Sequence, residues 1–386
     1  MPIIEENIMK KYYNPVEINF VESVDEVISA LEYENGKCLM IIQDNIKVMC
    51  DLRETFRKKL IEAGITVDIF NSIRPNPLYS DIDKGIQVIK EGNYDFLLAI
   101  GGGSTLDSAK VMAFSNKYDI RWQEMYNRDF KKVNPQKLPL IAVPTTFGTG
   151  SHVTQASVVS DSNNVKHTIF SDDFFPKTAY IIPALSLTLP NFLTASTSFD
   201  AFCHLSESYI NNRYSEISSH MAIEGMEKIV CNLPKVLKEN SLTYRNQLAI
   251  ADAYAGLTLS NGGANIPHTF GELITSSINR INHGQSLAIV YPYFIKSFFD
   301  DPAYREGIRG VLEIVNDQIP VICSSQAIEV MTDFLDEIGM SYNLSEYKVT
   351  PEELNRLKSY FKRQKKFQGV LIDEMISDLV NERIGE

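Results

Sequence analysis

The chain has 386 residues, of which 44% are hydrophobic and 22% charged, and this ordinary globular composition excludes disordered, collagen-like and coiled-coil proteins. With 37 Lys and Arg against 49 Asp and Glu, its formal net charge is −12, which disfavours nucleic acids and anionic lipid surfaces as partners. No apolar run approaches the roughly 18 residues that a membrane-spanning helix needs, so we expect no membrane protein.

The opening segment and the cysteines indicate the cellular compartment. The opening segment, MPIIEENIMKKYYNP, lacks the charged-then-apolar pattern of an export signal. The five cysteines are widely separated and include no CxxC pair, so neither a zinc ribbon nor a disulfide framework is indicated. We therefore expect a cytoplasmic protein with reduced thiols.

In the first half of the chain, short apolar runs alternate with longer amphipathic segments. One further helix begins near Leu106, directly after the run YDFLLAI and a glycine string. Repetition of strand and helix predicts a parallel sheet with helices on both faces. The predicted strands are 37–43, 66–71, 94–100 and 138–144, and the earlier predicted helices are 51–63 and 80–91.

After about residue 190 the periodicity becomes helical, and few alternating or β-branched runs remain. Two prolines in IIPALSLTLP bracket a short link, where we place a boundary near Ser186. We expect an α/β domain of Rossmann-like type over 1–186 and an all-helical domain over 187–386, with a cleft between them. The predicted helices are 217–237, 244–258, 320–338 and 351–360.

A glycine loop, Gly101-Gly102-Gly103-Ser104, opens the helix that follows the third predicted strand. Consecutive glycines let backbone N–H groups approach a phosphate, and the N-terminus of the following helix adds donors and partial positive charge. The string departs from the common GxGxxG fingerprint, because Leu106 stands where the last glycine would be. It indicates a pyrophosphate-binding loop, and a glycine-rich turn without a ligand is the alternative.

A second loop, PTTFGTGS at 144–151, leaves the strand LPLIAVP with similar small and hydroxyl-bearing residues. Two such loops at the carboxyl ends of parallel strands mark a shared crevice. Asp44 ends the run KCLMIIQD, where its carboxylate can accept from the adenosine ribose hydroxyls and repel a 2′-phosphate. That role favours NAD over NADP, and a turn or helix-cap aspartate is the alternative.

Four residues of the helical half form a candidate metal site. Asp200 and His204 are four residues apart, so on a helix they lie on one face and can share a cation. His268 and His283 stand at breaks between helical patterns and supply two more imidazoles. One carboxylate with three histidines suits Zn²⁺ or Fe²⁺ better than Mg²⁺ or Ca²⁺. For each histidine taken alone, a structural or surface role is the alternative.

GGGSTLDSAK, PTTFGTGS, the helix FDAFCH and the pair His268 and His283-Gly284 occur in an order and at a spacing that resemble the iron-containing (group III) alcohol dehydrogenase family. The resemblance extends from NPV and IRPNP near the amino end to HGQSLAIVYP. It implies an amino-terminal dinucleotide-binding α/β domain, a carboxyl-terminal helical domain and an active site between them. It also suggests a homodimer or larger homo-oligomer.

The same resemblance implies a set of site residues and a reaction. The implied reaction is hydride transfer between an alcohol carbon and the nicotinamide of NAD, with a divalent metal polarising the substrate oxygen. The implied metal ligands are Asp200, His204, His268 and His283. The implied cofactor-binding residues are Asp44, Gly101, Gly102, Gly103, Ser104, Asp107, Thr145, Thr146 and Gly150, with Lys110 completing the first motif.

Two positions depart from the family pattern. The glutamate that usually follows the second loop is His152 here, and the histidine that usually follows the third ligand by four residues is Glu272. Both positions would fall near the nicotinamide or the substrate, so we take them as candidate catalytic residues. His152 removes a negative charge and can add a positive one. We therefore hypothesise a small polar or anionic aldehyde, such as phosphonoacetaldehyde or sulfoacetaldehyde.

Other functions stay open. The HTFG string at His268 also resembles the dehydroquinate synthase branch of the same superfold, where NAD and a metal serve a cyclising elimination. A glutamate is the usual first ligand there, so Asp200 with His204 favours the dehydrogenase. A glycerol- or polyol-type dehydrogenase and a non-catalytic homologue are the remaining alternatives. The ligand set does not choose between Fe²⁺ and Zn²⁺.

Overall fold

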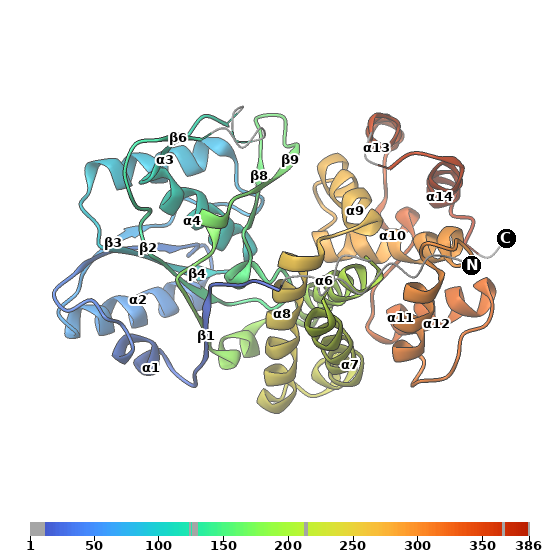
Figure 1. The fold of residues 1–386 in the computed structure, drawn as a ribbon, viewed down its shortest axis with the longest axis horizontal. Coiled ribbons are helices and arrows are strands. Elements are labelled where there is room, and N and C mark those ends of the chain that lie inside the picture. Colours follow the sequence, from blue (N-terminus) through green and yellow to red (C-terminus); the bar gives the residue numbers. More distant parts are fainter. Residues whose placement is uncertain (1–11, 123–124, 126–129, 212–214, 365–366, 385–386) are drawn as a thin grey trace. The chain divides into compact units, whose positions relative to one another are not determined.

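The computed structural model describes residues 12–122, 125, 130–211, 215–364 and 367–384, so most of the opening segment lies outside the described residues (Figure 1). The chain divides into two units. The sheet unit comprises Asn14–Leu189 and Ser241–Ala249. The helical unit comprises Pro190–Asn240 and Ile250–Glu386, together with the segment that ends at Tyr13. The main division follows Leu189 rather than residue 186, and the grouping of 241–249 with the sheet unit has no signal in the sequence.

Six strands form the main sheet of the sheet unit, in the order β1-β10-β7-β4-β2-β3. Each neighbouring pair is parallel, as the alternation of strands and helices predicts. The four predicted strands are confirmed, whereas β1 and β10 are too short for their periodicity to be detected. The strands are β1 (Glu17–Phe20), β2 (Lys37–Ile42), β3 (Thr66–Phe70), β4 (Phe96–Gly101), β7 (Leu140–Pro144) and β10 (Thr178–Ile181), with the antiparallel pairs β5 (Tyr118–Asp119) with β6 (Lys131–Lys132) and β8 (Ala156–Ser160) with β9 (Lys166–Phe170).

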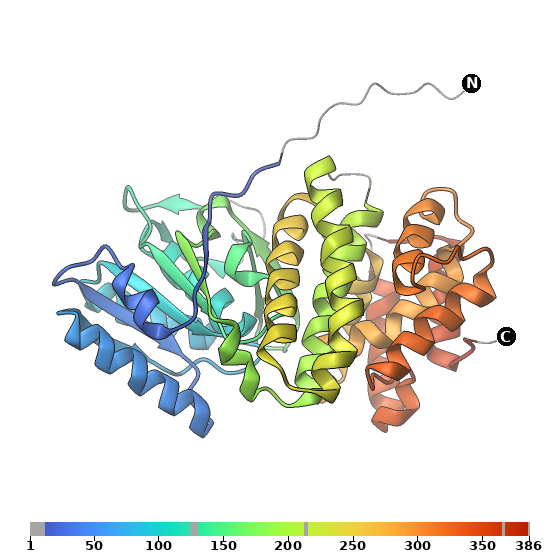
Figure 2. The ribbon, with the colours of Figure 1, turned by 90° about the horizontal axis from the view of Figure 1, so that it is seen from below.

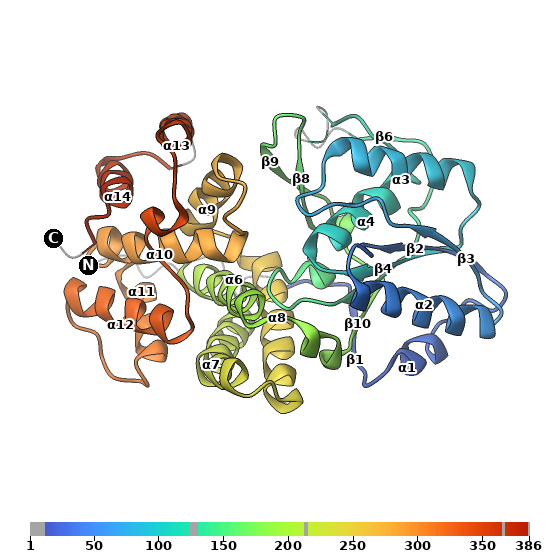
Figure 3. The same cartoon turned by 180° about the vertical axis from the view of Figure 1, so that it is seen from behind.

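Helices cover both faces of this sheet, as predicted. Successive side chains of β2 point to opposite faces. Leu39 and Ile41 join the core beneath α3 and α4, and Met40 and Ile42 join the core beneath α1 and α2. Figure 1 shows these two helical layers, and Figure 3 shows them from behind. The helices are α1 (Val24–Ser29), α2 (Lys47–Glu62), α3 (Tyr79–Glu91) and α4 (Gly103–Ser115), with short 3₁₀ turns η1 (Ser151–Val153), η2 (Asp172–Phe174) and η3 (Pro183–Thr188).

The helical unit contains long helices, several of which lie side by side in Figure 2. The four helices predicted after residue 190 are confirmed, with ends shifted by a few residues. Among the described residues, no helix has both the length and the apolar character needed to cross a bilayer. The helices are α6 (Asn191–Ile210), α7 (Glu216–Lys238), α8 (Leu242–Gly262), α9 (Ile266–Ser277), α10 (His283–Phe298), α11 (Arg305–Val315), α12 (Ser324–Glu337), α13 (Pro351–Arg363) and α14 (Val370–Asn381), with the 3₁₀ turn η4 (Leu344–Tyr347). The residues of α8 up to Ala249 group with the sheet unit.

Helix α6 positions the candidate metal site because it runs through the interior of its unit. It packs against α7, α10 and α11, and 15 of its 20 residues are buried. Its sequence mixes aromatic residues with Ser, Ala and Cys, which let neighbouring helices approach. It also carries Asp200, His204 and Glu207 into the interior. Buried polar groups need partners, so α6 must offer these side chains to other protein groups or to a ligand.

Candidate metal centre and dinucleotide site

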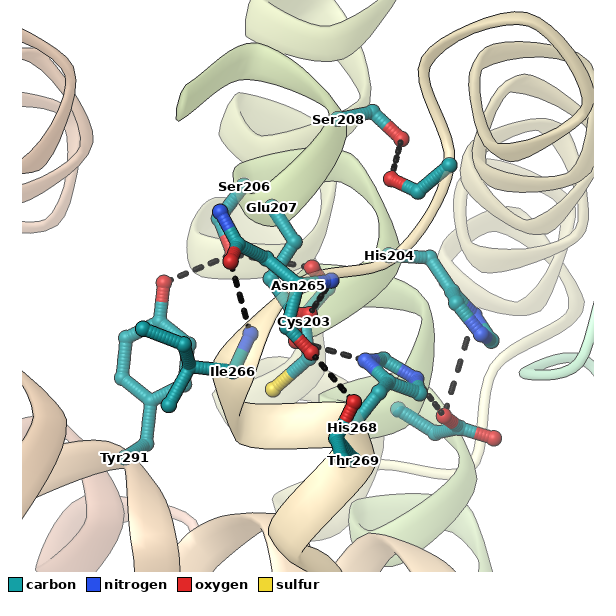
Figure 4. A network of polar contacts seen from close by, with 12 residues as sticks. Cys203, His204, Ser206, Glu207, Ser208, Asn265, Ile266, His268, Thr269 and Tyr291 are labelled. Atoms are coloured by element: carbon teal, nitrogen blue, oxygen red, sulfur yellow. Dashed lines mark hydrogen bonds and ion pairs between the residues drawn. The ribbon is translucent and has the colours of Figure 1, made fainter. Parts of the chain in front are cut away.

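Asp200 and His204 lie one turn apart on α6, and α9 brings His268 beside them. Oδ1 of Asp200 is 3.7 Å from Nδ1 of His204 and 3.3 Å from Nε2 of His268. One potential ligand atom of each residue lies within 4.8 Å of the others, and all three residues are buried. Figure 4 shows the imidazoles of His204 and His268 converging, and their centroids are 4.2 Å apart. The structure therefore brings three of the four predicted ligands into one cluster.

The fourth predicted ligand, His283, adjoins this cluster through Asp200. Its Nε2 is 3.6 Å from Oδ1 of Asp200, and its ring centroid is 5.3 Å from that of His268. His283 is the first residue of α10, which a capping box starts: Asn282 accepts from the N–H of Gln285, and Gln285 accepts from the N–H of Asn282. This cap ends the preceding loop and holds the imidazole at the helix N-terminus.

The cluster has the electrostatics of a cation site. Burial alone would raise the pKa of Asp200, but His204, His283 and His268 outweigh it and lower that pKa to about 2. Burial alone would lower the pKa of His268, but Glu207 and Asp200 outweigh it and raise that pKa to about 10. A buried carboxylate that is ionised near neutral pH needs a positive partner. The oxygen and imidazole donors suit Fe²⁺ or Zn²⁺, and these residues therefore fit a divalent ion.

One residue of the cluster was missed by the sequence reasoning. Glu207 is fully buried on α6, and its Oε1 is 2.5 Å from Nδ1 of His268. The signal was present in the sequence, since Glu207 follows His204 by three residues and Asp200 by seven, which is one face of a helix. An acidic residue at this spacing is also common on solvent-exposed helix faces, so its burial had to come from the structure.

In the sheet unit, the two predicted loops lie against each other. Gly101 ends β4 and Gly103 begins α4. A Cβ on Gly102 would lie 2.9 Å from Oγ1 of Thr146, and one on Gly103 would lie 2.8 Å from Cγ2 of Thr149. The glycines are thus required for the second loop to pack against the first, and they leave the first N–H groups of a 13-residue helix at the loop. This arrangement fits a pyrophosphate.

The remaining loop residues have local roles in the same arrangement. The N–H of Thr145 donates to the carbonyl oxygen of Gly101, which joins the two loops directly. Gly150 has φ of +59°, the left-handed conformation that favours glycine, just before η1. The hydroxyl of Ser104 accepts from the N–H of Asn76, so the IRPNP turn is tied to the first loop.

Asp107 and Lys110 face the second loop and β8 from inside α4. Asp107 accepts from Oγ of Ser151 at 2.5 Å and from the N–H of Val158 at 2.9 Å. Lys110, which is fully buried, donates to Oγ1 of Thr154 at 2.9 Å and to the carbonyl oxygen of residue 156 at 2.7 Å. Burial raises the pKa of Asp107 and lowers that of Lys110 to about 8, and each residue opposes the shift of the other. The described contacts of Asp107 are therefore with protein groups that shape the loop.

Asp44 lies two residues beyond β2, near the predicted end of that strand. Its carboxylate pairs with the guanidinium of Arg53 on α2 and accepts from Nδ2 of Asn71, which is 3.2 Å from each carboxylate oxygen. The side chain is therefore held in place rather than free to turn, and a guanidinium lies directly beside it.

The two departures from the family pattern lie in different units. His152 is buried in η1, and burial, with a smaller contribution from the Lys110 ammonium, lowers its pKa to about 3. The ring is uncharged near neutral pH, so the expectation that His152 adds positive charge was wrong. Glu272 lies on α9 one turn beyond His268 and is partly exposed.

Sequence comparisons identify relatives along nearly the whole chain. Residues 15–183 match the family described as iron-containing alcohol dehydrogenase, and residues 194–364 match the C-terminal domain of the same family. An NAD-dependent methanol dehydrogenase of Bacillus methanolicus is 27% identical over 324 residues, which cover 83% of this chain and 84% of that protein.

Solved structures agree with this family. An iron-containing alcohol dehydrogenase of Thermotoga maritima superposes with a TM-score of 0.82 at 25% identity, covering 98% of this chain and all of that chain. A sulfoacetaldehyde reductase of Bifidobacterium kashiwanohense, solved with NAD⁺, superposes with a TM-score of 0.79 at 25% identity, covering 97% of this chain and 99% of that chain. The chain belongs to the iron-containing alcohol dehydrogenase family. It is accordingly an oxidoreductase of the alcohol dehydrogenase class.

Proposed function

We propose that this protein is an NAD-dependent, metal-dependent alcohol dehydrogenase or aldehyde reductase that acts on a small polar substrate. The observation that carries the proposal is the buried cluster of Asp200, His204 and His268 in a member of this family. Burying an ionised carboxylate among imidazoles is costly unless the group is paired or binds a cation. A metal-binding role accounts for that arrangement.

We assign Asp200, His204, His268 and His283 as the ligands. A bound Fe²⁺ or Zn²⁺ supplies Lewis-acid polarisation of the substrate oxygen. The chain's contribution is to hold the donors in place: α6 carries two of them, and α9 and α10 carry one each. Asp200, with a pKa of about 2, is an anion at physiological pH and needs no deprotonation to bind. Membership of an iron-containing family favours iron over zinc.

For the cofactor we propose NAD, with the pyrophosphate at the N-terminus of α4 and the ribose hydroxyls at Asp44. The packing of the two glycine loops supports the first part. The carboxylate of Asp44 would repel a 2′-phosphate, which supports NAD over NADP. The Bacillus methanolicus relative is named for NAD, and the Bifidobacterium kashiwanohense structure contains NAD⁺. Thr145, Thr146 and Gly150 complete the proposed site, and Asp107 acts by shaping the second loop.

The substrate proposal stays with a small polar or anionic aldehyde and its alcohol. A sulfoacetaldehyde reductase among the structural relatives supports an anionic substrate, and a methanol dehydrogenase among the sequence relatives supports a small one. His152 contributes a neutral hydrogen-bonding ring, because its pKa is about 3. Glu272, partly exposed and one turn beyond His268, is the proposed group that passes a proton between the substrate oxygen and water.

The test is an aldehyde panel with NADH and with NADPH, using protein reconstituted in parallel with Fe²⁺ and Zn²⁺. Acetaldehyde, lactaldehyde, sulfoacetaldehyde and phosphonoacetaldehyde span neutral and anionic substrates of similar size. We expect NADH oxidation that depends on metal and a higher kcat/KM for at least one anionic aldehyde than for acetaldehyde. Metal-dependent turnover with only the neutral aldehydes would leave the enzyme class intact and reject the anionic substrate.

The controls address the sites directly. Asp200→Ala should abolish both metal retention and turnover, whereas His220→Ala, which changes an exposed histidine on α7, should retain both. His152→Glu should alter the order of the four aldehydes when they are ranked by kcat/KM.

Substrate consumption without net NADH oxidation would instead support a cyclase of the dehydroquinate synthase kind. A protein that retains less than a few tenths of a metal equivalent and has no activity would contradict the enzyme assignment. The homo-oligomer and the cytoplasmic location stay predictions.

A further inference from the structure

A second carboxylate lies behind the proposed ligands, on the same face of α6. Asp200, His204 and Glu207 are spaced by four and three residues, so they form one ridge along the helix. Glu207 is fully buried. A buried carboxylate needs hydrogen-bond donors around it, and those donors reveal what the residue does.

Both carboxylate oxygens of Glu207 contact polar groups of α9 or of its N-cap. Oε2 accepts from the backbone N–H of Asn265 at 2.5 Å, and Oε1 lies 2.5 Å from Nδ1 of His268 (Figure 4). Asn265 is the N-cap of α9, and its own side chain accepts from the N–H of Ile266. Glu207 thus places a negative charge at a helix N-terminus, which is electrostatically favourable, and it fixes the start of α9 on α6.

The contact with His268 determines which ring nitrogen faces the cluster. Because a carboxylate only accepts, Nδ1 of His268 carries the hydrogen and donates it to Glu207. Nε2 is then the nitrogen that lies 3.3 Å from Oδ1 of Asp200. A histidine whose far nitrogen donates to a carboxylate is the usual arrangement around protein metal ions, where the outer carboxylate orients the ring and raises its basicity.

We propose that Glu207 is a positioning residue of the metal centre, which acts through His268 and sets both the orientation of the ring and the affinity for the metal. This inference rests on the metal site proposed above. Asn211 supports the same arrangement, because its Oδ1 accepts from Nδ2 of Asn265 at 2.7 Å and so holds the cap that Glu207 also binds.

The test compares metal affinity in the full-length protein. Glu207→Gln keeps the shape of the side chain, but its amide can accept from only one of the two N–H donors. We expect Zn²⁺ and Co²⁺ to bind about 10- to 100-fold more weakly, measured by competition with a chromophoric chelator. We also expect the visible absorption bands of the Co²⁺ form to shift, because the imidazole is no longer held at one angle.

Two further variants separate positioning from packing. Ser206→Ala changes the neighbouring buried residue on α6, whose hydroxyl pairs with Cys203 and Tyr291 rather than with a proposed ligand. It should leave the metal affinity within about two-fold of that of the original protein. Glu207→Asp keeps the carboxylate but shortens the side chain by one methylene, so it should also weaken metal binding. It carries the test if Glu207→Gln does not fold.

The outcomes distinguish this inference from the metal site itself. If the unmodified protein binds no Zn²⁺ or Co²⁺, or Asp200→Ala binds them equally well, the metal site is wrong. If the unmodified protein binds one equivalent, and a folded Glu207 variant has the same affinity and the same Co²⁺ spectrum, only the role of Glu207 is wrong. A lower melting temperature with unchanged affinity would show a purely structural residue.

Discussion

The carbonyl oxygen of Ser196 lies only 1.8 Å from where a Cβ on Gly284 would stand. Gly284 follows His283 in the first turn of α10, and Ser196 lies one turn before Asp200 on α6. A Cβ cannot rotate away from a backbone oxygen, so α10 lies this close to α6 only because residue 284 is glycine. This close approach is what brings Nε2 of His283 to 3.6 Å from Oδ1 of Asp200.

We predict that Gly284→Ala moves the start of α10 away from α6 and weakens metal binding. Overpacking usually costs about 1–3 kcal/mol of the free energy of unfolding, and a clash with backbone belongs at the upper end of that range. Urea unfolding should show this loss, and chelator competition should show a lower Zn²⁺ affinity, because His283 is displaced.

Ser286→Ala is the matched control for Gly284→Ala. It alters a buried residue of the same helix without adding an atom, and the Ser286 hydroxyl donates to the carbonyl oxygen of His283 within that helix. The control should keep the Zn²⁺ affinity. Unchanged stability and unchanged Zn²⁺ affinity in Gly284→Ala would contradict the prediction that α10 needs glycine at residue 284 to pack against α6.

Local patterns were sufficient for the parts of the site that lie within one element. The four-residue spacing of Asp200 and His204 predicted their contact on α6, because a helix repeats every 3.6 residues. The apolar periodicity similarly located most helices and the four longer strands of the central sheet. Four-residue strands such as β1 and β10 gave no such signal, although both pair in the central sheet.

Contacts between elements could not be predicted in the same way. Nothing in the sequence near Gly284 indicates that the carbonyl oxygen of Ser196 will lie against it. Likewise, nothing near Glu207 indicates that this residue will be buried against His268 of α9. The charge expected for His152 was wrong for the same reason. A histidine in a polar loop is usually solvated, but the fold buries this one near Lys110.

The burial of His152 predicts a specific dependence of stability on pH. Its pKa is about 3 in the folded chain, against about 6.5 when unfolded. Between these values the unfolded chain binds more protons, so the free energy of unfolding falls as the pH is lowered from about 6.5 toward 3. The slope contributed by one such group approaches about 1.4 kcal/mol per pH unit.

His152→Gln removes this titration and should flatten that part of the pH profile, measured by urea unfolding at pH values of about 7, 6 and 5. His220→Gln changes an exposed histidine and should retain the original slope. A His152→Gln profile as steep as that of the unmodified protein would mean that the acid sensitivity arises from other groups.

Lys110→Met should loosen the proposed dinucleotide loops without affecting the proposed metal centre. The substitution keeps the length of the side chain but removes its hydrogen bonds to Thr154 and to the carbonyl oxygen of residue 156. It also leaves Asp107 buried without its ammonium partner. Breaking a buried pair costs about 3–5 kcal/mol. We expect a lower midpoint of urea unfolding and a higher Kd for NADH, measured by fluorescence, with an unchanged Zn²⁺ affinity. The double variant with Asp107→Asn should recover part of the stability, because no charge is then left unpaired.

An NADH affinity equal to that of the unmodified protein, in folded Lys110→Met, would contradict the idea that Asp107 and Lys110 shape the cofactor loops. An equal loss of Zn²⁺ affinity would instead indicate general unfolding.

Asp44 and Arg53 predict how cofactor preference can be changed. The carboxylate of Asp44 pairs with the guanidinium of Arg53, and in the proposed cofactor site it would repel a 2′-phosphate. Asp44→Ala removes the repulsion and releases a cation suited to bind phosphate. We expect the ratio of kcat/KM for NADPH to that for NADH to rise by about 10-fold or more, which corresponds to about 1.4 kcal/mol.

Arg53 provides the control for this change. The double variant Asp44→Ala with Arg53→Met should lose most of the gained NADPH activity, since no guanidinium then remains beside the former carboxylate. Arg53→Met alone should keep the preference for NADH, because Asp44 still repels the phosphate and Asn71 still holds its carboxylate. If Asp44→Ala left the cofactor ratio unchanged, Asp44 would be a structural turn residue, and the basis of cofactor choice would have to lie elsewhere in the sheet unit.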